Sequence, residues 1–260
     1  MRTMPPGAAF VDPTILAARS QVYRLLSWGF TVPTTGVLSE LADQKIWDEI
    51  LRATGKLPKE FIIKDDMTHL QKVASGIGPS KDSKDLGVAY TSLFGPADTE
   101  RPPPYETEYG QPHVFSQAQA LADISGFYIA FGLQLSQLVK ERPDYLGTEL
   151  EFMHILMQKE EYANSLGETD KAAICADAQR TFLDDHLGRW APPFCATLGK
   201  SNSSGFYATL GRLTLKFIDG ECKYLGLEPQ KVSWTPSPMT LLEEEEIGCP
   251  ADRCGAEGCG

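Results

Sequence analysis

Apolar residues recur about every three to four positions along most of the chain, the spacing that places them on one face of an α-helix. The first run follows Asp12-Pro13, a capping residue and a first-turn proline, and continues to Gly29. Strand signals are weak throughout. The pattern therefore predicts an all-α protein, with further helices over 37–53, 67–73, 85–94, 116–140, 144–167, 170–187 and 204–225.

Two stretches break this periodicity. Residues 97–112 are rich in proline and aromatic residues and are predicted to form a long loop. Beyond residue 227 the helical spacing is lost, and a run of four glutamates at 243–246 precedes a glycine- and cysteine-rich end. We therefore predict an N-terminal extension over 1–11, one helical domain over 12–227 and a mobile acidic tail over 228–260.

Composition narrows the class of protein. The chain has 260 residues, 42% of them hydrophobic and 23% charged, which is typical of a compact soluble domain. Its 24 basic and 35 acidic residues give a net charge of −11, which argues against nucleic-acid binding. No apolar run approaches the roughly 20 residues that span a bilayer, and the first residues do not resemble a secretion signal. We expect a cytoplasmic protein.

The six cysteines fall into two groups. Cys175, Cys195 and Cys222 stand singly among apolar residues, as small core residues do. The other three lie in the tail at equal five-residue steps, among glycines: Cys249, Cys254 and Cys259. Thiolates are soft metal ligands, but a closed site normally needs four of them at shorter spacing. A thiol-rich tail and a metal or iron–sulfur carrier are both open interpretations.

No compact catalytic motif is present. The four histidines are scattered, with no zinc-hydrolase pair, nucleophilic serine elbow or phosphate-binding loop. Asp184, Asp185 and His186 are predicted to form a solvated cluster at a helix end. An enzyme with a dispersed site, using His186, Asp185 and Glu151, is the weakest of the alternatives.

Two acidic segments suggest a peptide-binding surface. The loop 101–109 combines rigid prolines with Tyr105, Glu106 and Tyr109, a combination suited to a cationic, partly apolar peptide, although a packed connecting loop explains it equally well. Asp144 is predicted to cap the next helix, with Glu149 in its first turn. Together the two segments would form an anionic cleft.

Five segments, in order over about residues 12–226, resemble the TorD/DmsD/NarJ family of molybdoenzyme maturation chaperones. They are Tyr90-Thr91-Ser92-Leu93-Phe94-Gly95-Pro96, then Pro103-Pro104-Tyr105-Glu106-Thr107-Glu108-Tyr109, then Asp123 with Phe127-Tyr128, then Pro143-Asp144-Tyr145-Leu146-Gly147-Thr148-Glu149-Leu150-Glu151-Phe152-Met153, and Phe182-Leu183-Asp184-Asp185-His186-Leu187 with Trp190 and Phe194. The tail resembles the subgroup that serves type II enzymes of the DMSO reductase family.

The resemblance implies a single all-α domain of about ten helices, present as a monomer or a domain-swapped dimer. It also implies a non-enzymatic, cofactor-free chaperone. Such a protein binds the apo catalytic subunit of a molybdoenzyme and its twin-arginine signal peptide, assists insertion of the molybdenum cofactor and prevents premature export.

Carried over by position, client binding falls on Tyr105, Glu106, Tyr109, Asp144 and Tyr145, with Glu149 beside them. Tyr145 stands where many members have histidine, so no imidazole role transfers to that position.

Overall fold

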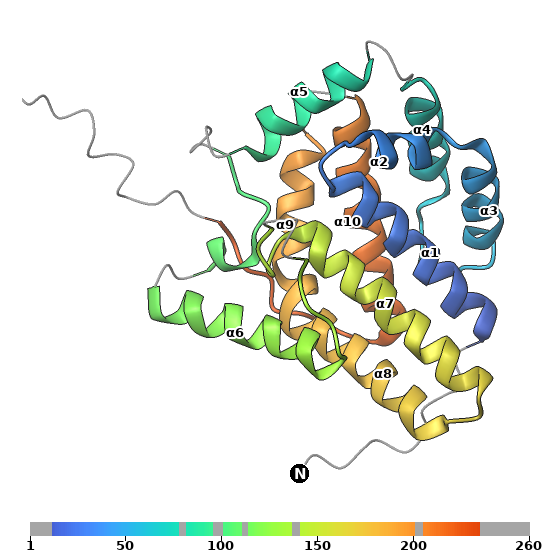
Figure 1. Ribbon diagram of the computed structural model, residues 1–260, viewed down its shortest axis with the longest axis vertical. Coiled ribbons are helices and arrows are strands. Elements are labelled where there is room, and N and C mark those ends of the chain that lie inside the picture. Colours follow the sequence, from blue (N-terminus) through green and yellow to red (C-terminus); the bar gives the residue numbers. More distant parts are fainter. Residues whose placement is uncertain are drawn as a thin grey trace, which may run out of the picture.

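The protein is all-α, as the periodicity predicts. The computed structural model describes residues 12–77, 82–95, 101–110, 114–136, 141–200 and 205–234 (Figure 1). Within them no strand occurs, and the helices are α1 (Pro13–Phe30), α2 (Thr35–Ala42), α3 (Gln44–Thr54), α4 (Lys64–Ser75), α5 (Asp82–Phe94), the short η1 (Glu106–Glu108), α6 (Val114–Ala130), α7 (Leu146–Ser165), α8 (Thr169–Phe182), η2 (Leu183–Leu187), α9 (Gly188–Leu198) and α10 (Gly205–Leu225).

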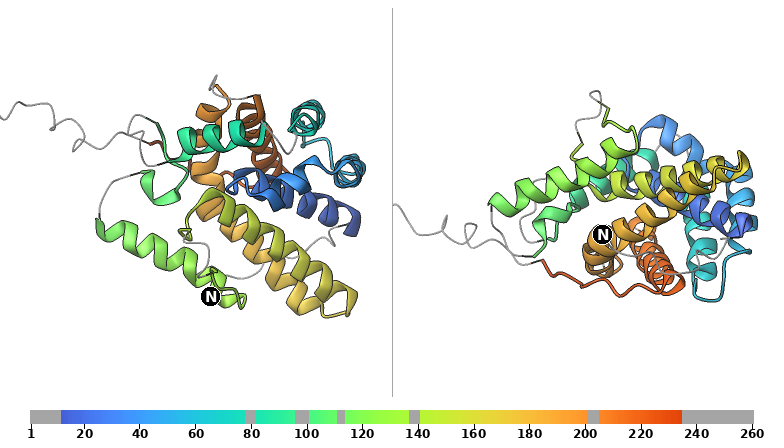
Figure 2. Two further views of the ribbon diagram at one scale, coloured as in Figure 1. Left: turned by 45° about the horizontal axis from the view of Figure 1, so that its top comes forward. Right: turned by 90° about the horizontal axis from the view of Figure 1, so that it is seen from below.

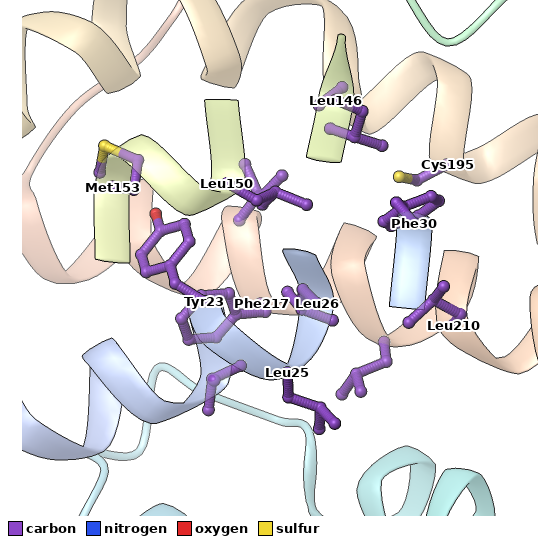
Figure 3. Packing of buried hydrophobic residues seen from close by; sticks show 14 of the residues in the cluster. Tyr23, Leu25, Leu26, Phe30, Leu146, Leu150, Met153, Cys195, Leu210 and Phe217 are labelled. Carbon is purple, nitrogen blue, oxygen red and sulfur yellow. The ribbon is translucent and has the colours of Figure 1, made fainter. Parts of the chain in front are cut away.

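The helical body is organised around α1, α7 and α10, which bury their apolar faces together. Figure 3 shows Leu26 and Phe30 of α1 beside Leu146 and Leu150 of α7, and all four side chains are fully buried. Each such burial stabilises the fold by about 1.5–3 kcal/mol. The ring of Tyr23 meets that of Phe217 edge-on at 4.8 Å. Helix α6 lies along one edge of the molecule and adds Ile124 and Tyr128 to the buried core (Figures 1 and 2).

Several helix limits follow from local sequence signals. The Asp12 carboxylate accepts a hydrogen bond from the backbone N–H of Thr14 at 2.8 Å, and Pro13 opens α1, as predicted. Gly167, with a φ of +72°, follows the end of α7, also as predicted. None of the described helices is long and apolar enough to cross a membrane.

Helices α8 and α9 are joined without a loop by a π-helical turn, η2. Such wider turns often occur at functional sites. The predicted solvated cluster is wrong for His186, because this turn buries its side chain while Asp185 stays exposed. Gly188 follows at a point of close approach, where a Cβ atom would lie 2.3 Å from the Leu183 carbonyl oxygen.

The chain stays on the helical body beyond residue 227. The backbone N–H of Val232 donates to the Arg189 carbonyl at 3.1 Å, and the N–H of Gly110 donates to the Ser233 carbonyl at 3.1 Å. The docked part of the chain therefore extends at least to residue 234, seven residues past the boundary that the loss of periodicity predicts. Residues 235–260 lie outside the described residues.

A buried ion pair ties α1 to α10. The Arg19 guanidinium donates to both carboxylate oxygens of Glu221 at 2.6 and 2.7 Å, and to Gln179 of α8 at 3.4 Å. Burial alone would lower the pKa of Arg19, but the Glu221 carboxylate outweighs it and the net pKa shift is upward. Removing one member of such a pair strands the other charge in the interior.

We therefore expect Glu221→Gln to lower the free energy of unfolding by about 3–5 kcal/mol in urea denaturation. The matched control is Glu168→Gln, which breaks the exposed pair with Lys171 and should change stability by about 1 kcal/mol or less. Equal effects of the two variants would contradict a structural role for the buried pair.

Candidate functional site

The proline-rich loop is fastened to the start of α7. Tyr105 and Tyr145 form an isolated antiparallel bridge. The backbone N–H of Glu106 donates to the Asp144 carbonyl, and the N–H of Leu146 donates to the Pro104 carbonyl, both at 3.0 Å. Two segments about forty residues apart thus act as one element, and both parts of the predicted peptide-binding region come together.

Asp144 fixes this junction from inside. Its side chain is fully buried and accepts hydrogen bonds from the Thr107 backbone N–H at 3.1 Å and the Thr107 hydroxyl at 2.8 Å. Arg142 donates to the same carboxylate through Nε at 2.9 Å and Nη2 at 2.8 Å. The predicted capping role is wrong, because Tyr145 occupies the N-cap position of α7 and the Asp144 carboxylate serves the loop instead.

The guanidinium of Arg142 also reaches the loop directly. It donates to Glu108 at 3.0 Å and lies 4.4 Å from the centre of the Tyr105 ring. The negative charge of Asp144 is therefore neutralised within the chain. A peptide arginine would meet this carboxylate only after Arg142 had been displaced.

The tyrosines of the region have mainly structural contacts. Tyr145 is buried, and its hydroxyl bonds to the Phe30 carbonyl and to the Tyr90 hydroxyl. Tyr109 is buried against Trp190 and donates to the Pro103 carbonyl at 3.0 Å. Tyr105 is only partly buried, and its hydroxyl donates to Glu141 at 3.3 Å. Of the three, Tyr105 is the most accessible to a ligand.

Behind the loop lies a chain of buried polar groups. His186 Nδ1 lies 3.0 Å from a Glu106 carboxylate oxygen, and its Nε2 lies 3.5 Å from Asp123 of α6. Trp190 Nε1 donates to the fully buried Glu149 at 3.0 Å. Burial, followed by the neighbouring Glu106 charge, raises the pKa of Glu149 well above its usual value.

Glu106 lies between this buried chain and an open pocket of about 250 Å³. The pocket is bounded by the η1 loop, α6, the first turn of α9 and the chain after α10. Its lining residues are Glu106, Thr107, Tyr109, Gly110, Gln117, Ala120, Arg189 and Val232. The Asp123 side chain, near the far side of His186, is 68% exposed. A cationic ligand can therefore meet Asp123 at the surface, and Glu106, whose side chain is 12% exposed, from within the pocket.

Comparison with known proteins identifies the family. The sequence profile of the nitrate reductase delta subunit family matches residues 63–196, which is just over half of the chain. This chain belongs to the nitrate reductase delta subunit family. The assignment confirms the resemblance to NarJ- and TorD-type proteins, a group of assembly chaperones rather than enzymes.

Members of this family with assigned roles align over much of the chain. The perchlorate reductase assembly chaperone protein of Dechloromonas aromatica (strain RCB) is 27% identical over 214 residues, covering 81% of this chain and 91% of that protein. The selenate reductase assembly chaperone protein of Thauera selenatis is 36% identical over 106 residues, covering 41% and 53%. The TorD chaperone of Vibrio atlanticus (strain LGP32) is 26% identical over 145 residues, covering 55% and 66%.

The sequence analysis did not predict the contacts that join different helices and loops in the candidate site. The pairing of Glu106 with His186 joins residues eighty positions apart, and Arg189 and Val232 reach the pocket from two further segments. One signal was available, because Asp123 and His186 both lie in segments that carry the family resemblance. The dispersed enzyme site is not assembled, since Asp185 and Glu151 are exposed while His186 is buried.

The three cysteines that precede the tail are core residues, as the sequence predicts. Cys175, Cys195 and Cys222 are buried free thiols, which confirms their core role. Burial raises the pKa of the Cys222 thiol to about 11. The candidate ligands Cys249, Cys254 and Cys259 lie outside the described residues. Within the part of the chain that the structure describes, no group of three or more potential ligands is arranged to hold a metal ion.

The raised pKa of Glu149 predicts a pH dependence of stability. The folded protein holds a proton that the unfolded chain releases, so stability should fall as pH rises above the ordinary glutamate range. Glu149→Gln keeps an acceptor for Trp190 and cannot ionise. In urea denaturation between about pH 5, just above the reference glutamate pKa, and about pH 8, the free energy of unfolding of this variant should therefore fall less than that of the wild type. Glu161→Gln, at an exposed position of α7, should retain the wild-type slope. A Glu149→Gln protein as pH-sensitive as wild type would contradict the assignment.

Proposed function

We propose that this protein is a cytoplasmic assembly chaperone for a molybdoenzyme of the DMSO reductase family. It binds the apo catalytic subunit, assists insertion of the molybdenum cofactor and holds the client back from export. Family membership and the relatives named as assembly chaperones of perchlorate, chlorate and selenate reductases support this role. The chaperone itself performs no covalent step.

We further propose that it binds the twin-arginine signal peptide of its client at the pocket beside Glu106. The observation that carries this step is an open pocket lined by Glu106, whose side chain is 12% exposed, together with the 68% exposed Asp123 on the other side of His186. A guanidinium can donate two parallel hydrogen bonds to a carboxylate. The partly buried Tyr105 offers a ring at the edge of the same loop.

The buried residues of the predicted set have a different part in this proposal. Asp144, Tyr145 and Glu149 position the loop and Glu106 rather than touch the peptide, because each is enclosed by other residues of the chain. Tyr109 forms part of the pocket wall itself, and its ring packs against Trp190. Substitution of these four residues should therefore weaken peptide binding through loss of loop order and stability.

Release follows from binding linkage. The chaperone has high affinity for the open, cofactor-free client and loses affinity when cofactor insertion closes the client. A binding partner shifts a conformational equilibrium only by its difference in affinity for the two states. The directional step thus comes from the client's own folding.

The peptide site is tested by removing its accessible charges. Glu106→Gln and Asp123→Asn should each weaken binding of a synthetic peptide with two consecutive arginines and an apolar run by about 10- to 100-fold, since a charge-assisted hydrogen bond contributes about 1.5–3 kcal/mol. Isothermal titration at two salt concentrations should also show a shallower salt dependence. The control Glu161→Gln removes the same charge from the last turns of α7 and should bind like wild type. Unchanged affinity and salt slope in both site variants would exclude this placement.

A further inference from the structure

The chain after α10 folds back across the functional region. Gly226, with a φ of +63°, follows the end of α10 and reverses the chain direction. Residues 228–234, which we call the strap, then run past the start of α9 to the loop that carries η1 (Figures 1 and 2). The strap thereby forms one wall of the pocket, through Val232.

The body holds the strap largely through its main chain. The N–H of Val232 donates to the Arg189 carbonyl and the carbonyl of Ser233 accepts from the Gly110 N–H, both at 3.1 Å. The Gln230 carbonyl accepts from the Arg189 side chain at 3.3 Å. Hydrogen bonds of this kind recognise an extended peptide whatever its sequence, and side-chain contacts add specificity.

Along the strap, one basic side chain is followed by two apolar ones. Lys231 donates to the Gly188 carbonyl at 2.8 Å and lies 3.8 Å from the Asp219 carboxylate. Val232 and Trp234 pack against the apolar core on either side of Ser233. Pro229 is buried against Gly188, where an added Cβ atom would lie 2.8 Å from the proline ring. The body therefore accommodates a basic residue followed by apolar ones.

The strap lies along Gly188, Arg189 and Gly110, a surface that adjoins the pocket beside Glu106 and that we call the client groove. We propose that the strap is an internal pseudo-ligand that occupies part of this groove, so that an incoming basic and apolar peptide must displace it. This inference rests on the proposed function, because the peptide shares the groove only if it binds beside Glu106. Basic residues precede apolar ones in both the strap and a twin-arginine signal peptide. Lys231 precedes Val232 and Trp234 in the strap, and the arginines precede an apolar run in the signal.

The strap is held weakly enough to be displaced. Its polar contacts are a few hydrogen bonds, each worth about 1 kcal/mol net, and a Lys231–Asp219 pair whose side chains are 42% and 44% exposed. Of its apolar side chains, Pro229 is buried, whereas Val232 and Trp234 are only partly buried. Exposed pairs of this kind contribute little. Peptide binds only those molecules in which the groove is open, so the apparent affinity equals the intrinsic affinity multiplied by the open fraction. A strap that is mostly closed therefore lowers the apparent affinity.

Loosening the strap in the full-length protein tests the proposal. Val232→Pro removes the N–H that bonds to Arg189 without changing charge, and Lys231→Ala removes the bond to Gly188. Each should tighten binding of the synthetic twin-arginine peptide by about three- to tenfold. Lys223→Ala, at an exposed position of α10, removes the same charge as Lys231→Ala and should leave the affinity unchanged.

Amide hydrogen exchange of the wild-type protein gives a second readout. Saturating peptide should increase exchange in residues 228–234, because the peptide replaces the strap. Wild-type affinity in Val232→Pro together with a strap that stays protected when peptide is bound would overturn the strap proposal and leave the proposed function intact. If no variant binds the peptide, the proposed peptide site fails and the strap proposal fails with it.

Discussion

The site depends on one buried carboxylate. Asp144 is enclosed, so its charge must be met by donors from the chain itself. Thr107 supplies two of them from the proline-rich loop, and Arg142 supplies the others from beside the start of α7. Satisfying this charge fastens two distant segments into one element. Everything that the loop carries, including Glu106, takes its place from that junction.

The junction sorts the acidic residues into two kinds. Asp144 and Glu149 lie inside, where the first is ion-paired and the second has a pKa well above its usual value. Glu106 and Asp123 border His186 and remain within reach of a ligand. The enclosed acids hold the loop, and the accessible ones give the pocket its negative charge. The strap borders the pocket through Val232, and its Lys231 bonds to the start of α9.

Local and long-range features differ in how far the sequence predicts them. The cap at Asp12, the turn at Gly167, the helical periods and the final helix follow from local sequence signals, because such signals act within a few positions. The two acidic segments were also correctly placed together. The sequence does not predict that Asp144 holds the loop, because its hydrogen-bond donors reach it only when the loop packs against the start of α7. The burial of His186 depends on a π-helical turn, for which the periodicity gave no sign. The docking of the strap depends on backbone groups, which carry no residue signature.

We propose that this chaperone recognises an immature molybdoenzyme subunit. The most direct measurement is a gentle affinity isolation of the full-length protein from its native cells during anaerobic respiration, with co-purifying chains identified by mass spectrometry. We expect recovery of a DMSO-reductase-family catalytic subunit that lacks its cofactor and retains its twin-arginine signal. Recovery of only the mature, cofactor-loaded enzyme, or of no molybdoenzyme subunit at all, would contradict it.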